Sequence, residues 1–355
     1  MTVPVAIIAA GVRTPLGLDA ASSAAALRAT ISSCSEHPFM VDQNGEPMPA
    51  SLDTQLRADQ PCRERMLILT RHVLKQVCLS VPEHPEFHSI PLLLGLPEPR
   101  PGFSEQDAQW LQQQLLQSSD LPVHLAACRA YMSGHSATLL LMDQARGEMA
   151  QGKYDVCLIA GVESYFHPDT MEWLDENRQL LGTVSRSGFV PAEGAGCCLL
   201  MTPAAASRAG LPALAMLTGS ATDWESKRIK TQEMNLGEAL ISTIRNMVGV
   251  LDSSRQKIHN VYCDINGERY RGEEWGFTCL KLAQYFDDPT AYCSPADCVG
   301  DMGAASGVLF AALAIQAAQR GYAAGSRSLL WTSSENGLRA AVMLEADVVP
   351  SPYRG

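Results

Sequence analysis

Five side chains of this sequence could take part in chemistry, and each lies near the end of an expected strand or the start of an expected helix. They are a thiol, an imidazole, a carboxamide and two carboxylates: Cys128, His135, Asn266, Asp301 and Glu335. A thiolate can act as a nucleophile, and an imidazole can move a proton near neutral pH. A carboxamide only donates and accepts hydrogen bonds. Two hypotheses follow: the five groups form one reactive site, or they persist because they hydrogen-bond one another.

The cysteines do not suggest a metal site. The chain has 11 of them, and none has the paired spacing of a zinc site: Cys197 and Cys198 are adjacent, and Cys293 and Cys298 lack a second close pair. We interpret them as small buried apolar residues in a protein kept in a reducing compartment. We therefore expect no metal and no cofactor.

Length and charge limit the class of protein. At 355 residues, with 46% hydrophobic residues and a net charge of −11, the chain is expected to be globular and to contain two domains or two similar halves. The negative charge argues against a nucleic-acid partner. Residues 3–12 lack a basic segment before them and are interpreted as a strand, not a signal peptide. No apolar run reaches the about eighteen residues that span a membrane, so a cytoplasmic protein is expected.

Short apolar runs alternate with longer helical patterns, as in a mostly parallel sheet covered by helices. Strands are expected at residues 5–10, 90–95, 123–131, 156–160, 196–201, 213–219, 260–263, 328–332 and 339–345. Helices are expected at residues 18–29, 63–81, 105–117, 136–151, 236–250, 275–285 and 304–319. Residues 34–61 are predicted to be a surface excursion, and the acidic pair at 273–274 an N-terminal helix charge. The pattern repeats after residue 208, which predicts an N-terminal half, 1–208, and a C-terminal half, 209–355.

Three segments carry a family resemblance. Residues 188–196 read Gly-Phe-Val-Pro-Ala-Glu-Gly-Ala-Gly, residues 152–163 read Gly-Lys-Tyr-Asp-Val-Cys-Leu-Ile-Ala-Gly-Val-Glu, and residues 6–19 contain Arg-Thr-Pro-Leu-Gly-Leu-Asp. In this order and spacing they resemble a ketosynthase, the condensing branch of the thiolase-like superfamily. The resemblance implies an α/β fold with five layers, αβαβα, made of two pseudo-repeated halves.

The resemblance also shows where catalytic residues should stand. The family's cysteine nucleophile falls on His135, its first histidine on Asn266 and its second on Gly300, while its lysine falls near Pro295. The glycine-rich loop that completes the oxyanion hole becomes residues 333–339, with Glu335 in place of an aromatic gate. Cys128 is the fallback nucleophile, but its use would require about two extra helical turns before the next motif. The Cys-His-His triad is therefore expected to be lost.

The sequences of four segments resemble a bacterial subgroup of ketosynthase-like proteins encoded in type VI secretion gene clusters. The segments are residues 13–19, 36–39, 161–165 and 173–175. That resemblance implies a cytoplasmic accessory or adaptor protein for a secreted effector. Two alternatives stay open: an active acyl-thioester-dependent ketosynthase or acyltransferase, and a module that binds an acyl group or acyl carrier without turnover. The family also implies a homodimer paired through residues 123–128.

Overall fold

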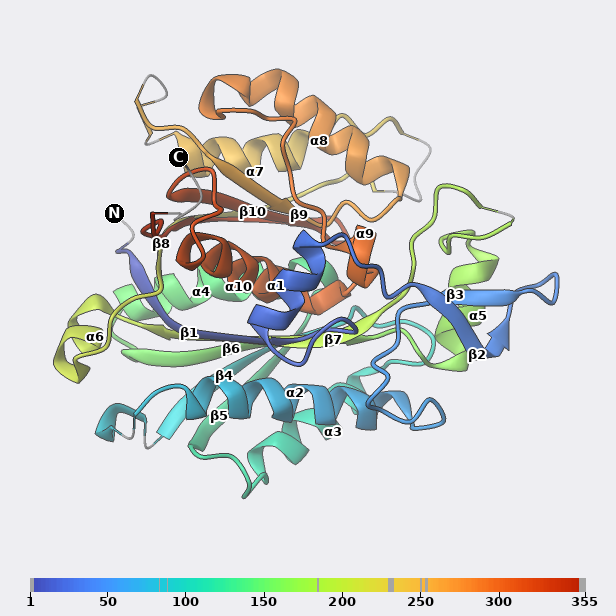
Figure 1. Cartoon of the computed structure of the whole chain (residues 1–355), viewed down its shortest axis with the longest axis horizontal. Helices are drawn as coiled ribbons and strands as arrows, with labels where there is room; N and C mark the ends of the chain where they lie inside the picture. The colour runs from blue at the N-terminus through green and yellow to red at the C-terminus, as the bar shows by residue number, and fades with distance from the viewer. Residues whose placement is uncertain are drawn as a thin grey trace.

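The computed structural model describes residues 3–82, 84–87, 89–183, 185–228, 233–249, 251–252 and 255–350. It places the helices and the sheet in five layers, which confirms the expected fold class (Figure 1). From top to bottom in Figure 1 the layers are α7 with α8, the C-terminal strands, α4 with α10 and α1, the N-terminal strands, and α2 with α3.

The N-terminal half forms a mixed sheet of five strands in the order β5-β4-β6-β7-β1. The three strands β5, β4 and β6 run parallel, and β7 runs antiparallel to both of its neighbours. Their bounds are β1 Val5–Arg13, β4 Ser89–Leu96, β5 His124–Met132, β6 Val156–Ser164 and β7 Glu193–Met201. Every residue of β6 and β7 is buried, which is why these strands read as continuous apolar runs.

The C-terminal half repeats this plan with four strands in the order β8-β11-β10-β9. They are β8 Ala215–Trp224, β9 Asn260–Cys263, β10 Arg327–Ser333 and β11 Leu338–Glu345. The place that β5 takes in the first half is reduced here to one parallel bridge, between Tyr262 and Cys293. The two halves join where β1 pairs with β8, between Val5–Ile7 and Ala215–Leu217, so all nine strands are hydrogen-bonded in one series.

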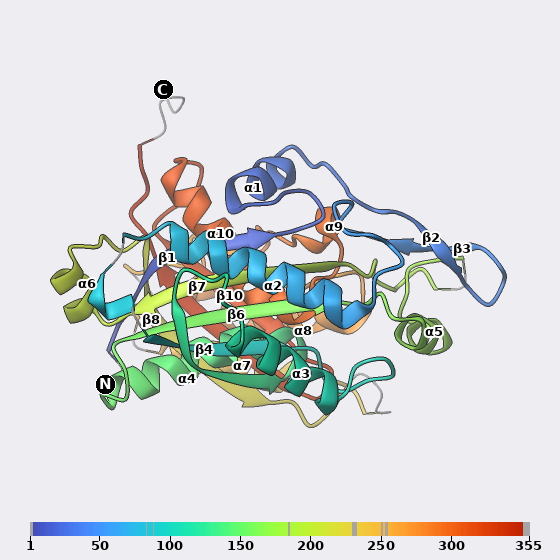
Figure 2. The same cartoon turned by 90° about the horizontal axis from the view of Figure 1, so that it is seen from below.

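Helices fill the space between the sheets and cover both outer faces. Their bounds are α1 Ala20–Arg28, α2 Cys62–Leu79, α3 Glu105–Leu116, α4 Ala137–Ala150, α5 Pro168–Glu176, α6 Pro203–Ala209, α7 Glu238–Val248, α8 Arg269–Leu282, α9 Ala296–Val299 and α10 Ser306–Gln319. Short 3-10 turns are η1 Pro85–Phe87, η2 Gly134–Ser136, η3 Ala283–Tyr285 and η4 Gly303–Ala305. Figure 2 shows α2 and α3 lying on one side of the N-terminal strands.

Residues 34–61, predicted to be a surface excursion, contain the β2–β3 hairpin of Ser35–Val41 and Pro47–Ala50, which projects at one end of the molecule beside α5 (Figures 1 and 2). Two details of α8 differ from expectation. Helix α8 begins at Arg269 and not at residue 275. The acidic pair at 273–274 therefore lies inside the helix, where buried Glu274 bonds Arg339 from β11.

Small residues allow the layers to approach closely around the centre. Gly194 in β7 is the clearest case, because a Cβ there would lie 2.3 Å from the Met302 Cε atom and 2.7 Å from the Arg13 carbonyl oxygen. Neighbouring Glu193 is fully buried and is held by the guanidinium of Arg65. The Glu-Gly-Ala-Gly run thus supports the floor beneath the site described next.

Candidate functional site

His135 lies in the turn η2, between the end of β5 and the start of α4. Its side chain is 9% exposed, and its Nε2 atom lies 2.9 Å from both carboxylate oxygens of Asp301. Asp301 follows α9 in the C-terminal half, so the contact joins residues 166 positions apart. Because Nε2 faces a carboxylate, this nitrogen carries the proton.

Asp301 collects donors from four directions. Besides His135 it accepts hydrogen bonds from the Tyr165 hydroxyl at 3.0 Å, from the backbone N–H of Gly303 at 2.7 Å, and from the carboxamide of Asn266. It is 3% exposed. The expected cluster of His135, Asn266 and Asp301 is therefore present as one buried, hydrogen-bonded group.

Gly300 stands at the position that corresponds to the family's second catalytic histidine. As a glycine it contributes no side chain to the cluster of His135, Asn266 and Asp301. Its φ of +75° lies in the region that favours glycine, and a Cβ there would come within 2.9 Å of the Val190 carbonyl oxygen. Gly300 makes the turn, and its neighbour Asp301 supplies the side chain at the centre.

Arg271 is the main residue that the sequence analysis missed. It comes from α8, is fully buried, and places Nη2 3.3 and 3.5 Å from the two ring nitrogens of His135. Its guanidinium also bonds Asp264 at 2.5 Å, Glu268 at 3.1 Å and the Ser333 carbonyl oxygen at 2.6 Å. The signal lay in the run Arg269-Tyr270-Arg271, but the helix was expected to begin after it.

The charged groups of this cluster shift one another's pKa values. Burial and Arg271 lower the pKa of His135, but Asp301 and Asp264 raise it more, so the net shift is upward. Burial raises the pKa of Asp301, whereas His135 and Arg271 lower it to a net value well below its usual range. The site is therefore a buried ion cluster in which Arg271 and the protonated form of His135 face the carboxylates of Asp301 and Asp264.

Backbone donors around His135 are already used. The N–H of Ser136 donates to the Ser334 hydroxyl at 2.8 Å, and the N–H of Asn336 donates to the Glu98 carboxylate at 3.3 Å. An oxyanion hole needs such donors free and aimed at the reacting oxygen. These two donors are occupied by the protein itself.

Glu335 and His135 line the same small cavity. Its Oε1 atom accepts a hydrogen bond from the Gln179 carboxamide at 2.6 Å. The cavity holds about 60 Å³ and is lined by Glu98, Pro99, Arg100, Gly134, His135, Glu163, Tyr165, Trp173, Leu174 and Glu335. A volume of this size holds a few water molecules.

The Cys128 side chain lies on the outer face of the N-terminal strands, not on the inner face. Within β5, Cys128, Ala130 and Met132 pack against the outer core under α2 and α3, whereas Tyr131 packs against the core between the sheets. The backbone carbonyl of Cys128 accepts from Gln112 in α3 at 3.0 Å. Burial raises the pKa of its thiol to about 12, so it is protonated near neutral pH.

Two further properties concern the described residues as a whole. No group of three or more His, Cys, Asp or Glu side chains in this part of the chain is arranged to hold a metal ion. None of the helices in it has both the length and the apolar character needed to cross a bilayer.

Comparisons with known proteins point to one fold. The family model described as "Beta-ketoacyl synthase, N-terminal domain" matches residues 130–206, which include His135 and the motif at 188–196. A search of curated proteins by sequence finds no match.

Solved structures match over nearly the whole chain. The ketosynthase from module 6 of the bacillaene synthase of Bacillus subtilis 168 has a TM-score of 0.75 at 14% identity, covering 97% of this chain and 72% of that one. The ishigamide ketosynthase/chain length factor has a TM-score of 0.68 at 17% identity, covering 97% and 99%. A type II ketosynthase, AntDE, in complex with its acyl-carrier protein AntF, has a TM-score of 0.75 at 12% identity, covering 98% and 100%. The chain therefore has the thiolase-like fold of the ketosynthases, and its residues 130–206 match their N-terminal domain.

Proposed function

We propose that this chain is a catalytically degenerate ketosynthase-like scaffold whose role is to bind a protein partner. The observation that carries the proposal is the buried ion cluster of His135, Asp301 and Arg271. A condensing site needs a thiolate nucleophile and groups that exchange protons with the substrate. Here the nitrogen and oxygen atoms of His135, Asp301 and Arg271 contact other groups of the protein.

Cysteine placement supports the same proposal. All 11 cysteines belong to the described part of the chain, and none lines the cavity beside His135. The His135 imidazole is tied to Asp301 and covered by Arg271, so it is not free to carry an acyl group. Asn266 donates to Asp301 and Glu268 and has no titratable proton to transfer.

The small size of the cavity argues against the alternative of an acyl-binding module without turnover. An acyl chain needs a long tunnel, whereas this cavity holds only about 60 Å³ and has Glu98, Glu163 and Glu335 in its wall beside Trp173 and Leu174. Burial raises the pKa of Glu98, with the charge of Glu335 acting in the same direction. The small volume of the cavity is therefore the main feature that disfavours an acyl chain.

As to biological role, we propose that the partner is an effector or adaptor of a type VI secretion system, and that this chain is its cytoplasmic accessory protein. What supports this is the resemblance of residues 13–19, 36–39, 161–165 and 173–175 to the subgroup encoded in such gene clusters. A pull-down from the native host, with mass spectrometry of the captured proteins, tests the role. Capture of no secretion component by the tagged wild-type chain would contradict it.

Incubation with malonyl- and octanoyl-coenzyme A tests the loss of catalysis. We expect no condensation product and no change in intact mass, because the cluster offers no thiolate. Cys128→Ser is the matched control, and it should behave as the wild type does. An acyl adduct on the wild-type chain that disappears in Cys128→Ser would show an active enzyme. Co-purified fatty acyl groups, found by native mass spectrometry, would instead favour the acyl-binding alternative.

A further inference from the structure

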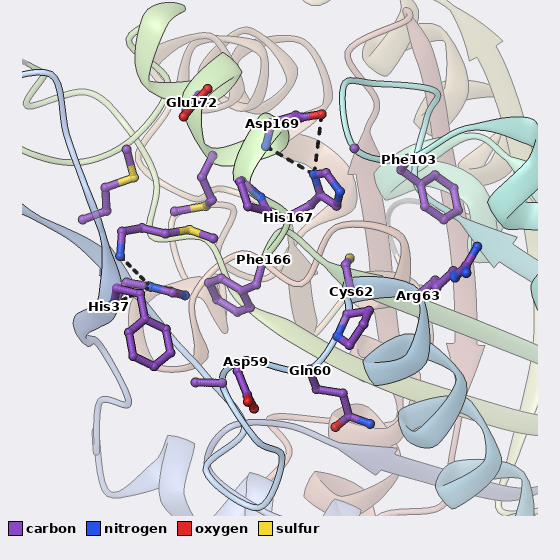
Figure 3. A pocket seen from close by; sticks show the side chains of 18 of the residues that line it. His37, Asp59, Gln60, Cys62, Arg63, Phe103, Phe166, His167, Asp169 and Glu172 are labelled. Carbon is purple, nitrogen blue, oxygen red and sulfur yellow. Dashed lines mark hydrogen bonds and ion pairs between the residues drawn. The ribbon is translucent and has the colours of Figure 1, made fainter.

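A second and much larger pocket lies between the β2–β3 hairpin and the N-terminal ends of α2, α3 and α5 (Figure 3). Its volume is about 930 Å³. Among the lining residues of the two cavities, Arg100 is the one that they share, so the pocket and the cavity beside His135 are otherwise lined by different residues. The ion cluster at His135 does not use this pocket.

The base of the pocket is apolar. Phe103, Phe166, Met48 and Met171 line it and are all buried. At its rim the hairpin presents Phe39, which is 70% exposed and therefore costly to leave in water. Buried aromatic and methionine side chains beside an exposed phenylalanine are typical of a surface that receives an apolar anchor from a partner.

His37 contributes a hydrogen-bond donor that no described residue uses. Its Nδ1 atom accepts from the backbone N–H groups of Phe39 at 3.2 Å and Met40 at 3.1 Å, so the proton of the neutral ring is on Nε2. That Nε2 atom is buried and has no partner among the described residues. Figure 3 shows the imidazole turned toward Phe166, whose ring centroid lies 5.5 Å away. A carbonyl oxygen of an occupant would satisfy this donor.

The positive charges of the pocket are already balanced. Arg63 lies 3.8 Å from the Asp107 carboxylate, and Arg100 lies 2.6 Å from Glu163. The buried Arg100 pair leaves no charge for an anionic ligand. Arg63 is shared between Asp107 and the ring of Trp110, 4.9 Å away.

The pocket has more carboxylates than guanidinium groups, and the two carboxylates that pair with no guanidinium among the described residues, Asp169 and Glu172, lie on α5. Asp59 pairs with Arg57, but Asp169 has only the imidazole of His167 at 3.9 Å. That imidazole caps α5, because its Nδ1 atom accepts a hydrogen bond from the Asp169 N–H at 3.2 Å. Glu172 is exposed and forms no ion pair with the described residues. Two carboxylates at the rim are thus available to a cation.

We propose that this pocket binds an extended peptide segment of a partner protein, in which an apolar side chain is flanked by lysine or arginine. The apolar base accepts the anchor, Asp169 and Glu172 attract the basic flank, and His37 donates to a peptide carbonyl. Opposite charges across an interface mainly set specificity and association rate. The inference rests on the proposed scaffold function and names the surface and the chemistry through which the partner is held.

Fluorescence anisotropy with three labelled peptides tests this proposal. The peptides share a Leu-Phe-Leu core and differ only in flanks of lysine, glutamine or glutamate. We expect the lysine-flanked peptide to bind more tightly than the glutamine-flanked one, and the glutamate-flanked peptide to bind least. Raising the salt concentration should reduce these differences, because the charges lie at an exposed rim.

Exposed positions supply variants that leave the fold intact. Glu172→Lys should weaken the lysine-flanked peptide about fivefold and improve the glutamate-flanked one, since it reverses a rim charge. Phe39→Ala should weaken all three about tenfold, as expected for loss of an aromatic contact at the interface. The matched controls are Asp347→Lys, an exposed carboxylate in the C-terminal segment, and Leu280→Ala, 80% exposed on α8. Neither should change the affinity.

Two outcomes overturn the proposal: no binding of any peptide, or affinities that Glu172→Lys and Phe39→Ala change no more than the controls do. Acylation by thioesters would remove the proposed scaffold function but would leave these peptide affinities untouched. Conversely, a partner captured equally by the wild type and both pocket variants would leave the scaffold function standing and place its interface elsewhere. The two claims can therefore fail separately.

Discussion

His135 and Asp301 each favour the charged form of the other, and this electrostatic coupling makes the stability of the fold depend on pH. The pKa of His135 is raised in the folded chain, so its contribution is complete below its unfolded value of about 6.5 and is lost as pH rises through the folded value. The pKa of Asp301 is lowered, so its contribution is present above about 4 and is lost only as pH falls through its folded value. The pair should stabilise the fold most between about pH 4 and 6.5.

We expect His135→Ala to lower the free energy of unfolding by about 1–3 kcal/mol, the cost of leaving a buried partner unsatisfied. The loss should be largest near pH 5 and should shrink as pH rises through the folded pKa of His135, because the imidazole then loses its charge. Urea unfolding at several pH values measures it. An equal loss at every pH would mean that packing, not charge, is what His135 contributes. The peptide pocket should be unaffected, because His135 does not line it.

Gly300 gives a second prediction at this scale. Gly300→Ala should destabilise the chain by about 1–3 kcal/mol, because a side chain is strained at this backbone angle and its Cβ meets Val190, Ala192 and Ser51. Gly272→Ala is the control: it lies in α8, and a Cβ there meets nothing within 4 Å. That change should stabilise by about 0.5–1 kcal/mol, as alanine does in a helix interior. Thermal melting of both variants decides whether the Gly300 turn is required.

At the scale of elements, β5 is the edge strand of the N-terminal half in the strand order of the described chain. An open edge presents unpaired N–H and C=O groups and tends to pair with another strand. We expect β5 to pair with its copy in a homodimer, so light scattering should give about twice the 38.3 kDa of one chain. Ala126→Lys adds a charge at an exposed position of this strand and should shift the mass toward the monomer. A wild-type mass of one chain at micromolar concentration would contradict the dimer.

Elements were predictable where local pattern determines them. Strands β6 and β7 are buried on both faces, so their apolar runs identified them, although both extend beyond their expected bounds. Helix α8 was placed too late because Gly272, Gly276 and the acidic pair at 273–274 disguise its first turns. Glu274 can be buried only because Arg339, 65 positions away, reaches it with two hydrogen bonds. No local pattern contains that partner.

The site shows the same division. The resemblance identified His135, Asn266 and the loop with Glu335, since those positions follow motifs in sequence order. Arg271 and Tyr165 were missed because their roles arise only when α8 and the end of β6 are folded against η2. Asp301 was named as a polar candidate, but its central place, with four donors around one carboxylate, depends on the Gly300 turn.

At the scale of the whole molecule, the layer between the sheets unites the two halves. Helix α10 belongs to the C-terminal half, yet it packs against β1, β6, β7, α1 and α4 of the N-terminal half. Twelve of its 14 residues are buried. The polar centre is shared in the same way, because His135 comes from one half and both Asp301 and Arg271 from the other. The boundary predicted near residue 208 lies in the last turn of α6, which ends at Ala209, shortly before β8 begins at Ala215.

We therefore expect neither half to fold alone. Residues 209–355 on their own would expose the apolar faces of α10, and residues 1–208 would leave the inner face of their sheet in water and His135 without Asp301. Each should be insoluble when expressed separately, because that apolar surface drives aggregation. Co-expressed, they should form a soluble complex that a tag on either fragment recovers. A soluble 1–208 fragment with its own cooperative melting transition would show that the N-terminal half is an independent domain and that α10 is an addition to it, not its core.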